Sequence, residues 1–290
     1  MTPNNNFSVL PFYRNLSEQN HRKSYAYGQI YPLIVPLTTL IPFQIMRETS
    51  TGTINTVKVE LMRKDGTLFA NISEEMRDAG LQIAKFPSLG YDVIVFTGLF
   101  PIGVSIPEGM YYLSVNDGVH QWYSDIFTAV ERTDGYLKIE WYDAENLIFD
   151  AGIIVYKNPR FKNILYLCTE LGKPEYPFEE DGETRDGYFF PEKQISEKTY
   201  KCTALAPEYL CDVMRFIRMS DFVFVTDKYG RVYDCDTFLI TPKWQTQGDL
   251  ASVEIEFDTA TVVKKIGKGY IAGDDFNNDF NNDFSINSQS

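Results

Sequence analysis

The chain has 290 residues, of which 44% are apolar and 15% aromatic, and its formal net charge is −13. So negative a balance argues against a protein that follows nucleic-acid phosphates, because such proteins present basic surfaces. The sequence has no apolar run of the ~18 residues or more that indicates a membrane-spanning helix, so no membrane span is expected. The length suggests two domains, and the pattern of short segments predicts a mainly β protein with a boundary near residues 131–135.

The N-terminal residues 1–24 are polar and irregular apart from one apolar patch. This composition predicts an arm that lies along a partner, with Phe7, Phe12 and Tyr13 as candidate interface residues. The following apolar stretch, residues 27–46, is interrupted by prolines, which cannot donate to a sheet ladder. It is therefore expected to form edge strands or extended segments.

Residues 25–132 alternate between short β-forming segments and turn signals, a pattern typical of an immunoglobulin-like β-sandwich. Residues 54–62 and 67–72 are predicted to pair as a hairpin, and residues 73–79 to form one helical turn capped by Ser73. Further strands are predicted at residues 81–85, 91–97, 107–115 and 122–130.

Residues 133–270 predict a second domain of α+β type, an antiparallel sheet that carries one helix. In the predicted helix, residues 207–219, the apolar residues Leu210, Val213, Met214 and Ile217 recur at the spacing of a single face. We expect this face to pack on the sheet. Strands are predicted at residues 136–142, 147–156, 161–168, 198–205, 222–225, 232–240 and 250–257.

An acidic stretch, residues 172–191, separates two of these strands and has no clear periodicity. It is interpreted as a long loop carried on the sheet, and long loops are often functional. It contains Glu179, Glu180, Asp181, Glu183 and Asp186 among aromatic residues. Paired carboxylates can serve a glycosidase, but the adjacent Glu179 and Glu180 point apart in an extended chain, so a solvated loop is the favoured interpretation.

The C-terminal residues 271–290 form a low-complexity arm in which Asp, Asn and Phe recur with a period of four. Its candidate interface residues are Phe276, Phe280 and Phe284, which would share one side of a helix and dock in a groove. Asp and Asn oxygens also suit calcium, but the glycine and the terminal glutamate of an EF-hand loop are missing. An assembly arm is the favoured interpretation, and plain disorder the alternative.

The remaining chemically active residues favour structural roles. His21 and His120 are too few and too isolated for a nucleophilic triad. The four cysteines form no C-x-x-C pair, so buried thiols are expected, with a zinc site or disulfides as the alternatives. Trp122, Trp141 and Trp244 are expected as core or interface anchors, with sugar stacking as the alternative. We therefore expect no catalytic residue, no metal and no cofactor.

Several strings resemble structural proteins from the tails of bacteriophages that infect gut Bacteroidales, including crAss-like phages. In the first domain they are Gly109-Met-Tyr-Tyr-Leu-Ser-Val and Trp122-Tyr-Ser-Asp-Ile-Phe. In the second domain they are Lys198-Thr-Tyr-Lys, Ala206-Pro-Glu-Tyr-Leu, Asp221-Phe-Val-Phe-Val, Pro242-Lys-Trp-Gln and the run from Gly248 to Phe257. The resemblance spans roughly residues 105–265. It implies a virion component, made in the host cytoplasm, that forms a ring or collar of the tail with copies of itself and with other tail proteins.

Two classes of function follow from the sequence. The first is a non-enzymatic structural component of a phage tail, working through repeated protein–protein contacts. The alternative is a carbohydrate-binding or adhesin-like β-sandwich module. An enzyme ranks third, because no motif of catalytic spacing is present.

Overall fold

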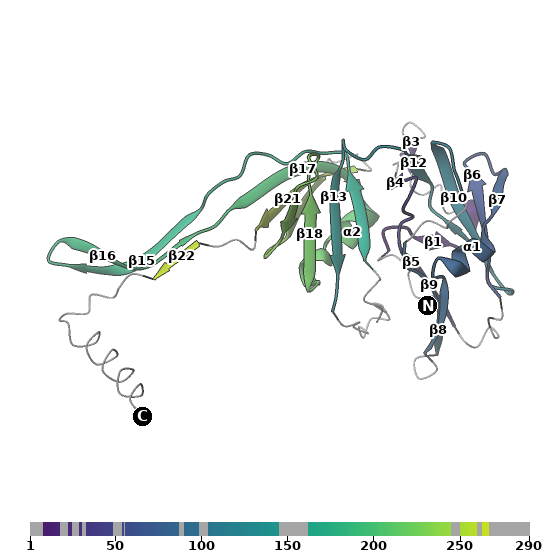
Figure 1. Ribbon diagram of the computed structural model, residues 1–290, viewed down its shortest axis with the longest axis horizontal. Helices are drawn as coiled ribbons and strands as arrows, with labels where there is room; N and C mark the ends of the chain where they lie inside the picture. The colour runs from purple at the N-terminus through teal and green to yellow at the C-terminus, as the bar shows by residue number, and fades with distance from the viewer. Residues whose placement is uncertain are drawn as a thin grey trace, which may run out of the picture.

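The structure is a computed structural model that describes residues 8–17, 23–24, 29–30, 33–48, 54, 56–86, 90–98, 104–144, 162–244, 250–259 and 263–266. Antiparallel strands dominate it, so the prediction of a mainly β fold is confirmed. Figure 1 shows two β bodies side by side and a long hairpin that extends from the second body away from the first. No helix in the described ranges is both long and apolar enough to span a bilayer.

The larger sheet of the first body is organised around β10 (Gly109–Asn116). One edge of β10 pairs with β6, which in turn pairs with β7. Its other edge is shared end to end by β11 and β12, so the predicted return strand, residues 122–130, is broken in two. The remaining members are β1 (Phe12–Tyr13), β4 (Leu33–Pro36), β6 (Lys58–Arg63), β7 (Leu68–Asn71), β11 (Gln121–Ser124) and β12 (Phe127–Val130).

A smaller sheet of order β5-β9-β8 packs against this one. Phe12 of the large sheet packs against Phe43 of the small sheet with ring centroids 4.7 Å apart, and Phe43 contacts Phe96 at 5.6 Å. The two sheets enclose one apolar core, so a β-sandwich forms as predicted. The small sheet contains β5 (Phe43–Glu48), β8 (Gln82–Phe86) and β9 (Tyr91–Phe96), and a separate two-stranded ladder joins β2 (Lys23–Ser24) to β3 (Gln29–Ile30).

Two predictions for the first body are wrong. The described part of the N-terminal arm is not peripheral, because Val9, Leu10 and Phe12 are buried and β1 pairs with β11. Ser73 does not cap α1 (Ser73–Asp78), since it is the first helical residue and its hydroxyl binds Asn71 and the carbonyl of Val59 instead. Both errors arise because pairing with distant strands decides the local structure.

A buried ion pair joins the two sheets of the sandwich. Arg47 on β5 lies 3.3 Å from Asp117 in the turn after β10, and neither side chain is exposed. The Asp117 carboxylate also accepts hydrogen bonds from the N–H groups of Val119 and His120 and from the indole of Trp122. Burial raises the pKa of Asp117, but these bonds and the Arg47 charge outweigh it and hold the pKa below its usual value.

The second body contains two sheets, not the single sheet that the sequence predicted. One has the order β14-β13-β18-β19 and the other β17-β21-β20. The chain crosses between them after β19, where the predicted strand, residues 232–240, breaks. The bounds are β13 (Leu137–Tyr142), β14 (Asn163–Leu167), β17 (Thr199–Pro207), β18 (Phe222–Thr226), β19 (Val232–Asp234), β20 (Leu239–Trp244) and β21 (Leu250–Asp258). The predicted strand at 147–156 lies outside the described residues.

The helix α2 (Glu208–Met214), extended by a 3₁₀ turn (Ile217–Met219), contacts the sheet of β17, β20 and β21. Leu210, Val213, Met214 and Ile217 are all essentially fully buried, so the predicted apolar face is confirmed. Along β21 buried and half-buried positions alternate at every residue, again as predicted.

The acidic stretch, residues 172–191, is not a loop. It forms most of a hairpin, here called the arm, made of β15 (Phe178–Arg185) and β16 (Tyr188–Ser196), with β22 (Val263–Ile266) added along β16. Figure 1 shows the arm projecting well beyond the second body. Backbone pairing provides most of the stabilisation of these strands, because both faces of the arm are largely exposed.

Candidate interaction sites on the arm and at its root

The tip of the arm is a tight two-residue turn. Arg185 pairs with Tyr188, so Asp186 and Gly187 occupy the two central positions. Their φ angles are 52° and 82°, which is the backbone of a type I′ turn. This turn matches the twist of the flanking strands and fixes the register, so each side chain of the arm has a defined face.

A β-bulge bends the arm between Asp181 and Gly182, where the register shifts. A Cβ atom on Gly182 would collide with the carbonyl of Phe190 on the facing strand. Any other residue would therefore force the two strands apart at this point. The bulge sets the direction in which the outer half of the arm points.

Large aromatic side chains of the arm are exposed to solvent. Tyr188 is 72% exposed, Phe178 59%, Phe189 49% and Phe190 36%. Single exposed apolar residues are common, but a group on one projecting element is typical of a surface that binds another protein. These aromatic residues make the arm the first candidate interaction site.

The acidic residues of the arm alternate between its two faces. Glu179, Asp181 and Glu183 share one face of β15, and the Glu183 carboxylate accepts a hydrogen bond from Arg185 at 2.8 Å. Glu180 lies on the opposite face and accepts a hydrogen bond from Gln194. Because Glu179 and Glu180 point apart, they do not form the facing pair of carboxylates that glycoside hydrolysis uses.

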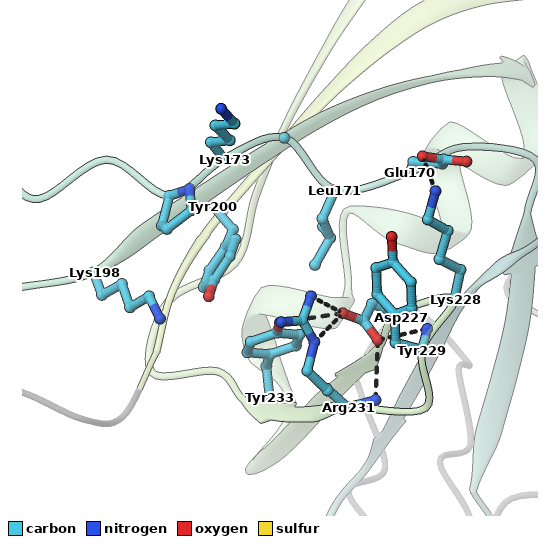
Figure 2. A pocket seen from close by; sticks show the side chains of 12 residues that line it. Glu170, Leu171, Lys173, Lys198, Tyr200, Asp227, Lys228, Tyr229, Arg231 and Tyr233 are labelled. Atoms are coloured by element: carbon cyan, nitrogen blue, oxygen red, sulfur yellow. Dashed lines mark hydrogen bonds and ion pairs between the residues drawn. The ribbon is translucent and has the colours of Figure 1, made fainter.

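A cavity of about 290 Å³ lies at the root of the arm, which we define as residues 170–175 and 197–200. Figure 2 shows its lining residues, which come from both root segments, from the turn after β18 and from β19, with the Lys173 side chain directed away from the others. Its charged lining is predominantly basic, with Lys173, Lys198, Lys228 and Arg231. Lys228 is neutralised by Glu170, which it contacts at 2.6 Å.

Asp227 and Arg231 form a fixed unit at the floor of this cavity. The Asp227 carboxylate accepts hydrogen bonds from the N–H groups of Tyr229 and Arg231 and from the Arg231 Nε at 2.7 Å. Burial raises the pKa of Asp227, but these bonds outweigh it and hold the pKa below its usual value. Asp227 therefore stays ionised at neutral pH and anchors the guanidinium by its Nε and Nη2 edge.

Two tyrosines and a lysine lie opposite this guanidinium (Figure 2). Tyr200 packs on Tyr233 with ring centroids 4.7 Å apart, and the Tyr233 hydroxyl donates to Asp227 at 3.2 Å. A hydrogen bond with Tyr200 raises the pKa of Lys198, while the nearby charge of Arg231 opposes that rise. Lys198 and Arg231 therefore face the same cavity and lie close enough to repel each other. A bound anion would stabilise this arrangement.

The predicted interface residues have mixed outcomes. Phe12 is a core residue and is wrong as an interface candidate. Tyr13 is half-buried on β1, where it pairs with Tyr123. Phe7, Phe276, Phe280 and Phe284 lie outside the described residues, as does the whole C-terminal arm.

The other residues singled out in the sequence are mostly internal. Trp122 and Trp141 are core residues, as expected of anchors, while Trp244 is 47% exposed. His120 is half-buried beside Asp117, with its Nδ1 3.6 Å from the carboxylate, and His21 lies outside the described residues.

The four cysteines are free thiols, and the expectation that all are buried is wrong for Cys168, which is exposed, while Cys235 is only half-buried. Burial raises the pKa of Cys211 to about 11 and those of Cys202 and Cys235 to about 12, which keeps these thiols protonated and unreactive. Within the described part of the chain, no three His, Cys, Asp or Glu side chains gather as metal ligands would.

The arm and its root were missed by sequence reasoning for different reasons. Asp186-Gly187 is a strong hairpin signal, and it could have identified the arm. The cavity has no such signal, because its residues come from three separate segments that only the fold brings together.

No family model matches this chain, and no curated protein matches it. Among solved structures, the chain is similar to one from the crystal structure of the ZIG-8–RIG-5 IG1–IG1 heterodimer, monoclinic form. The two are 16% identical, and the likeness covers 40% of this chain and 96% of the other at a TM-score of 0.17. So low a TM-score carries no argument about function.

Proposed function

We propose that the protein is a non-enzymatic structural component of a bacteriophage virion tail, where it forms a ring or collar through repeated protein–protein contacts. Its partners are copies of itself and neighbouring tail or collar proteins. The setting in a tail rests on the resemblance of the sequence strings, and the structural role rests on the shape of the molecule.

One observation carries the proposal: the arm exposes aromatic side chains on an element that projects from the core. A hairpin of two or three strands without a buried face gains little stability of its own, so its aromatic surface is best explained by contacts made with a partner. Weak contacts of this kind become strong when they are repeated around a closed assembly. A projecting arm on a rigid body suits that role.

The carbohydrate-binding alternative loses its main support. Sugar stacking needs exposed aromatic faces, but Trp122 and Trp141 lie in the core. Trp244 alone of the three tryptophans is substantially exposed.

The test is the assembly state of the purified full chain. Sedimentation velocity from low to high micromolar concentration, with electron microscopy of the product, should reveal high-order species, including rings. A chain that stays monomeric throughout that range, or binds glycans as a monomer on an array, would overturn the proposal.

A further inference from the structure

We propose that the cavity at the root of the arm is a binding site for a small organic monocarboxylate, which Arg231 and Lys198 would hold together. The inference goes beyond the proposed function and does not depend on it. Its structural basis is the arrangement of three features around one cavity: a fixed guanidinium, a nearby ammonium group and a wall of tyrosine rings.

Arg231 presents a fixed guanidinium to the cavity. Its Nε and Nη2 atoms lie 2.7 and 2.6 Å from the Asp227 carboxylate. A guanidinium has five N–H donors, so donors remain on the edge that bears Nη1, and a carboxylate matches such an edge in two-pronged geometry. Because Asp227 already holds the side chain, binding at the second edge would cost less conformational freedom than binding to a mobile arginine.

Lys198 supplies a second cation from the link between β16 and β17. A hydrogen bond with Tyr200 is the first cause of its raised pKa, and no carboxylate is among the main causes. Within the described ranges Lys198 forms no ion pair. Figure 2 shows its side chain extending toward Tyr233 and the Arg231 guanidinium. An anion between the two cations would therefore contact both.

The charges of the lining favour an anion with a single charge. Arg231 is balanced by Asp227, and Lys228 is neutralised by an ion pair of 2.6 Å. The Lys173 side chain is directed away from the other lining residues (Figure 2). One uncompensated charge, that of Lys198, remains at the cavity. A carboxylate would balance it, whereas a phosphate group carries a charge of about −1.5 to −2 at neutral pH and would leave an excess.

The rest of the lining suits a small apolar or aromatic body. Tyr200, Tyr229 and Tyr233 contribute aromatic rings, and Leu171 and Pro174 contribute aliphatic surface. The cavity volume of about 290 Å³ lies at the lower limit of small-molecule sites, which is roughly 300 Å³. A carboxylate attached to one ring or a short aliphatic chain is therefore the class of ligand that the cavity fits.

Such a ligand would connect the arm to the body. Lys198 belongs to the link through which β16 continues into β17, and Arg231 belongs to the turn between β18 and β19. A carboxylate held by both residues would restrain the link where the arm leaves the second body. Binding would therefore slow local opening of the backbone on both sides of the cavity.

Benzoate binding to the full-length chain tests the proposal. Benzoate joins one carboxylate to one ring, and benzamide has nearly the same shape without the charge. Isothermal titration calorimetry and ligand-observed NMR should show saturable binding of benzoate. Benzamide and inorganic phosphate should bind about tenfold more weakly or worse, because neither combines a single negative charge with an apolar body.

Two variants test the two cations. Arg231→Lys keeps the charge but removes the fork, and Lys198→Gln removes the uncompensated charge. Each should weaken benzoate binding about tenfold or more. Lys173→Gln is the matched control, because this lysine lies at the same root with its side chain directed away, and it should bind benzoate like the parent. Circular dichroism should show each variant folded, and Lys198→Gln decides the test if Arg231→Lys does not fold.

Hydrogen exchange locates the site. Benzoate should slow amide exchange in residues 196–201 and 227–233 of the full-length chain. Four outcomes would overturn the proposal: no saturable binding by the parent, equal binding of benzamide or phosphate, benzoate binding by Lys198→Gln that equals that of the parent or of Lys173→Gln, and protection confined to other segments. None of them bears on the proposed function, which the assembly state tests separately.

Discussion

β16 and β17 are consecutive lengths of one run of chain, separated by two residues, yet their environments are opposite. Along β17 alternate side chains such as Cys202 and Ala204 are buried against β21 and α2, while along β16 all but the inner end is largely exposed. The same difference separates β21 from β22, which follows it onto the arm. A strand can therefore form by backbone pairing without packing on a core. The large apolar side chains on the exposed part of β16 indicate that this part contacts another molecule.

Removal of one charge from the buried ion pair should have the largest effect on stability. Asp117→Ala should lower the free energy of unfolding by about 3–5 kcal/mol, because it leaves Arg47 buried and unpaired. Denaturant unfolding would measure the loss. Arg185→Ala, which removes an ion pair exposed on the arm, is the control and should change little. Equal effects at the two sites would contradict the distinction between interior and arm.

Emptying a core site should have the next largest effect. Leu210→Ala in α2 should cost about 2–5 kcal/mol, because the leucine is fully buried and its cavity would collapse only in part. Leu205→Ala on the outer face of β17, where the side chain is 58% exposed, serves as the matched control. A loss below about 0.5 kcal/mol for Leu210→Ala would show that the helix does not pack as described.

Lowering the pH should test the contribution of the buried ion pair, because it protonates Asp117. Its pKa is lower in the folded protein than in the unfolded chain, so the stability it contributes is complete at neutral pH. That stability is lost as the pH falls below the pKa that Asp117 has in the unfolded chain and through the lower pKa that it has in the folded protein. In an unfolding series from pH 7 downward, Asp117→Asn should therefore lose less stability than the parent. Parallel curves for the two proteins would contradict this assignment.

Replacing exposed aromatic residues of the arm should affect self-association and not stability. Tyr188→Ser with Phe189→Ser should leave the melting temperature nearly unchanged, because neither ring packs in the core. The same variant should weaken self-association in sedimentation experiments. A large fall in melting temperature would show that the arm packs on the body.

The smallest expected effect on stability is that of the C-terminal arm. Deletion of residues 271–290 should leave the melting temperature of the isolated protein nearly unchanged, because the segment has too few apolar residues to form a core. Burial of one of its phenylalanines in a partner would contribute about 1.5–3 kcal/mol before ordering costs. The deletion should therefore reduce incorporation into the assembly, and quantitative incorporation would mark the segment as a passive appendage.

The predictable parts of the fold are those in which local pattern and burial agree. The alternation along β21 and the apolar face of α2 follow directly from residue spacing, because each element buries one side. The sequence predicts a loop in place of the arm because charged residues obscure the period of two, although Asp186 and Gly187 are typical turn residues. The burial of Phe12 is not predictable from local pattern, because it depends on β11, more than a hundred residues away.

The candidate sites were less predictable than the fold. The cavity at the root of the arm joins residues from three segments, and periodicity within one segment carries no information about the others. The Asp227 and Arg231 pair is local, but its importance depends on Tyr200 of another sheet and on Lys198 in the link that precedes β17.

The continuity of the arm with the core has a mechanical consequence. β16 runs into β17 and β22 follows from β21, and β17 and β21 pair with each other over nine residues. β15 is connected to β14 through residues 168–177, whereas a pull on β16 and β22 would reach the body through two neighbouring strands that move together, so the ladder between β17 and β21 would not open one bond at a time. The force would act on the pairing of β21 with β20 and on the packing of α2. The second body would therefore resist a force applied to the arm.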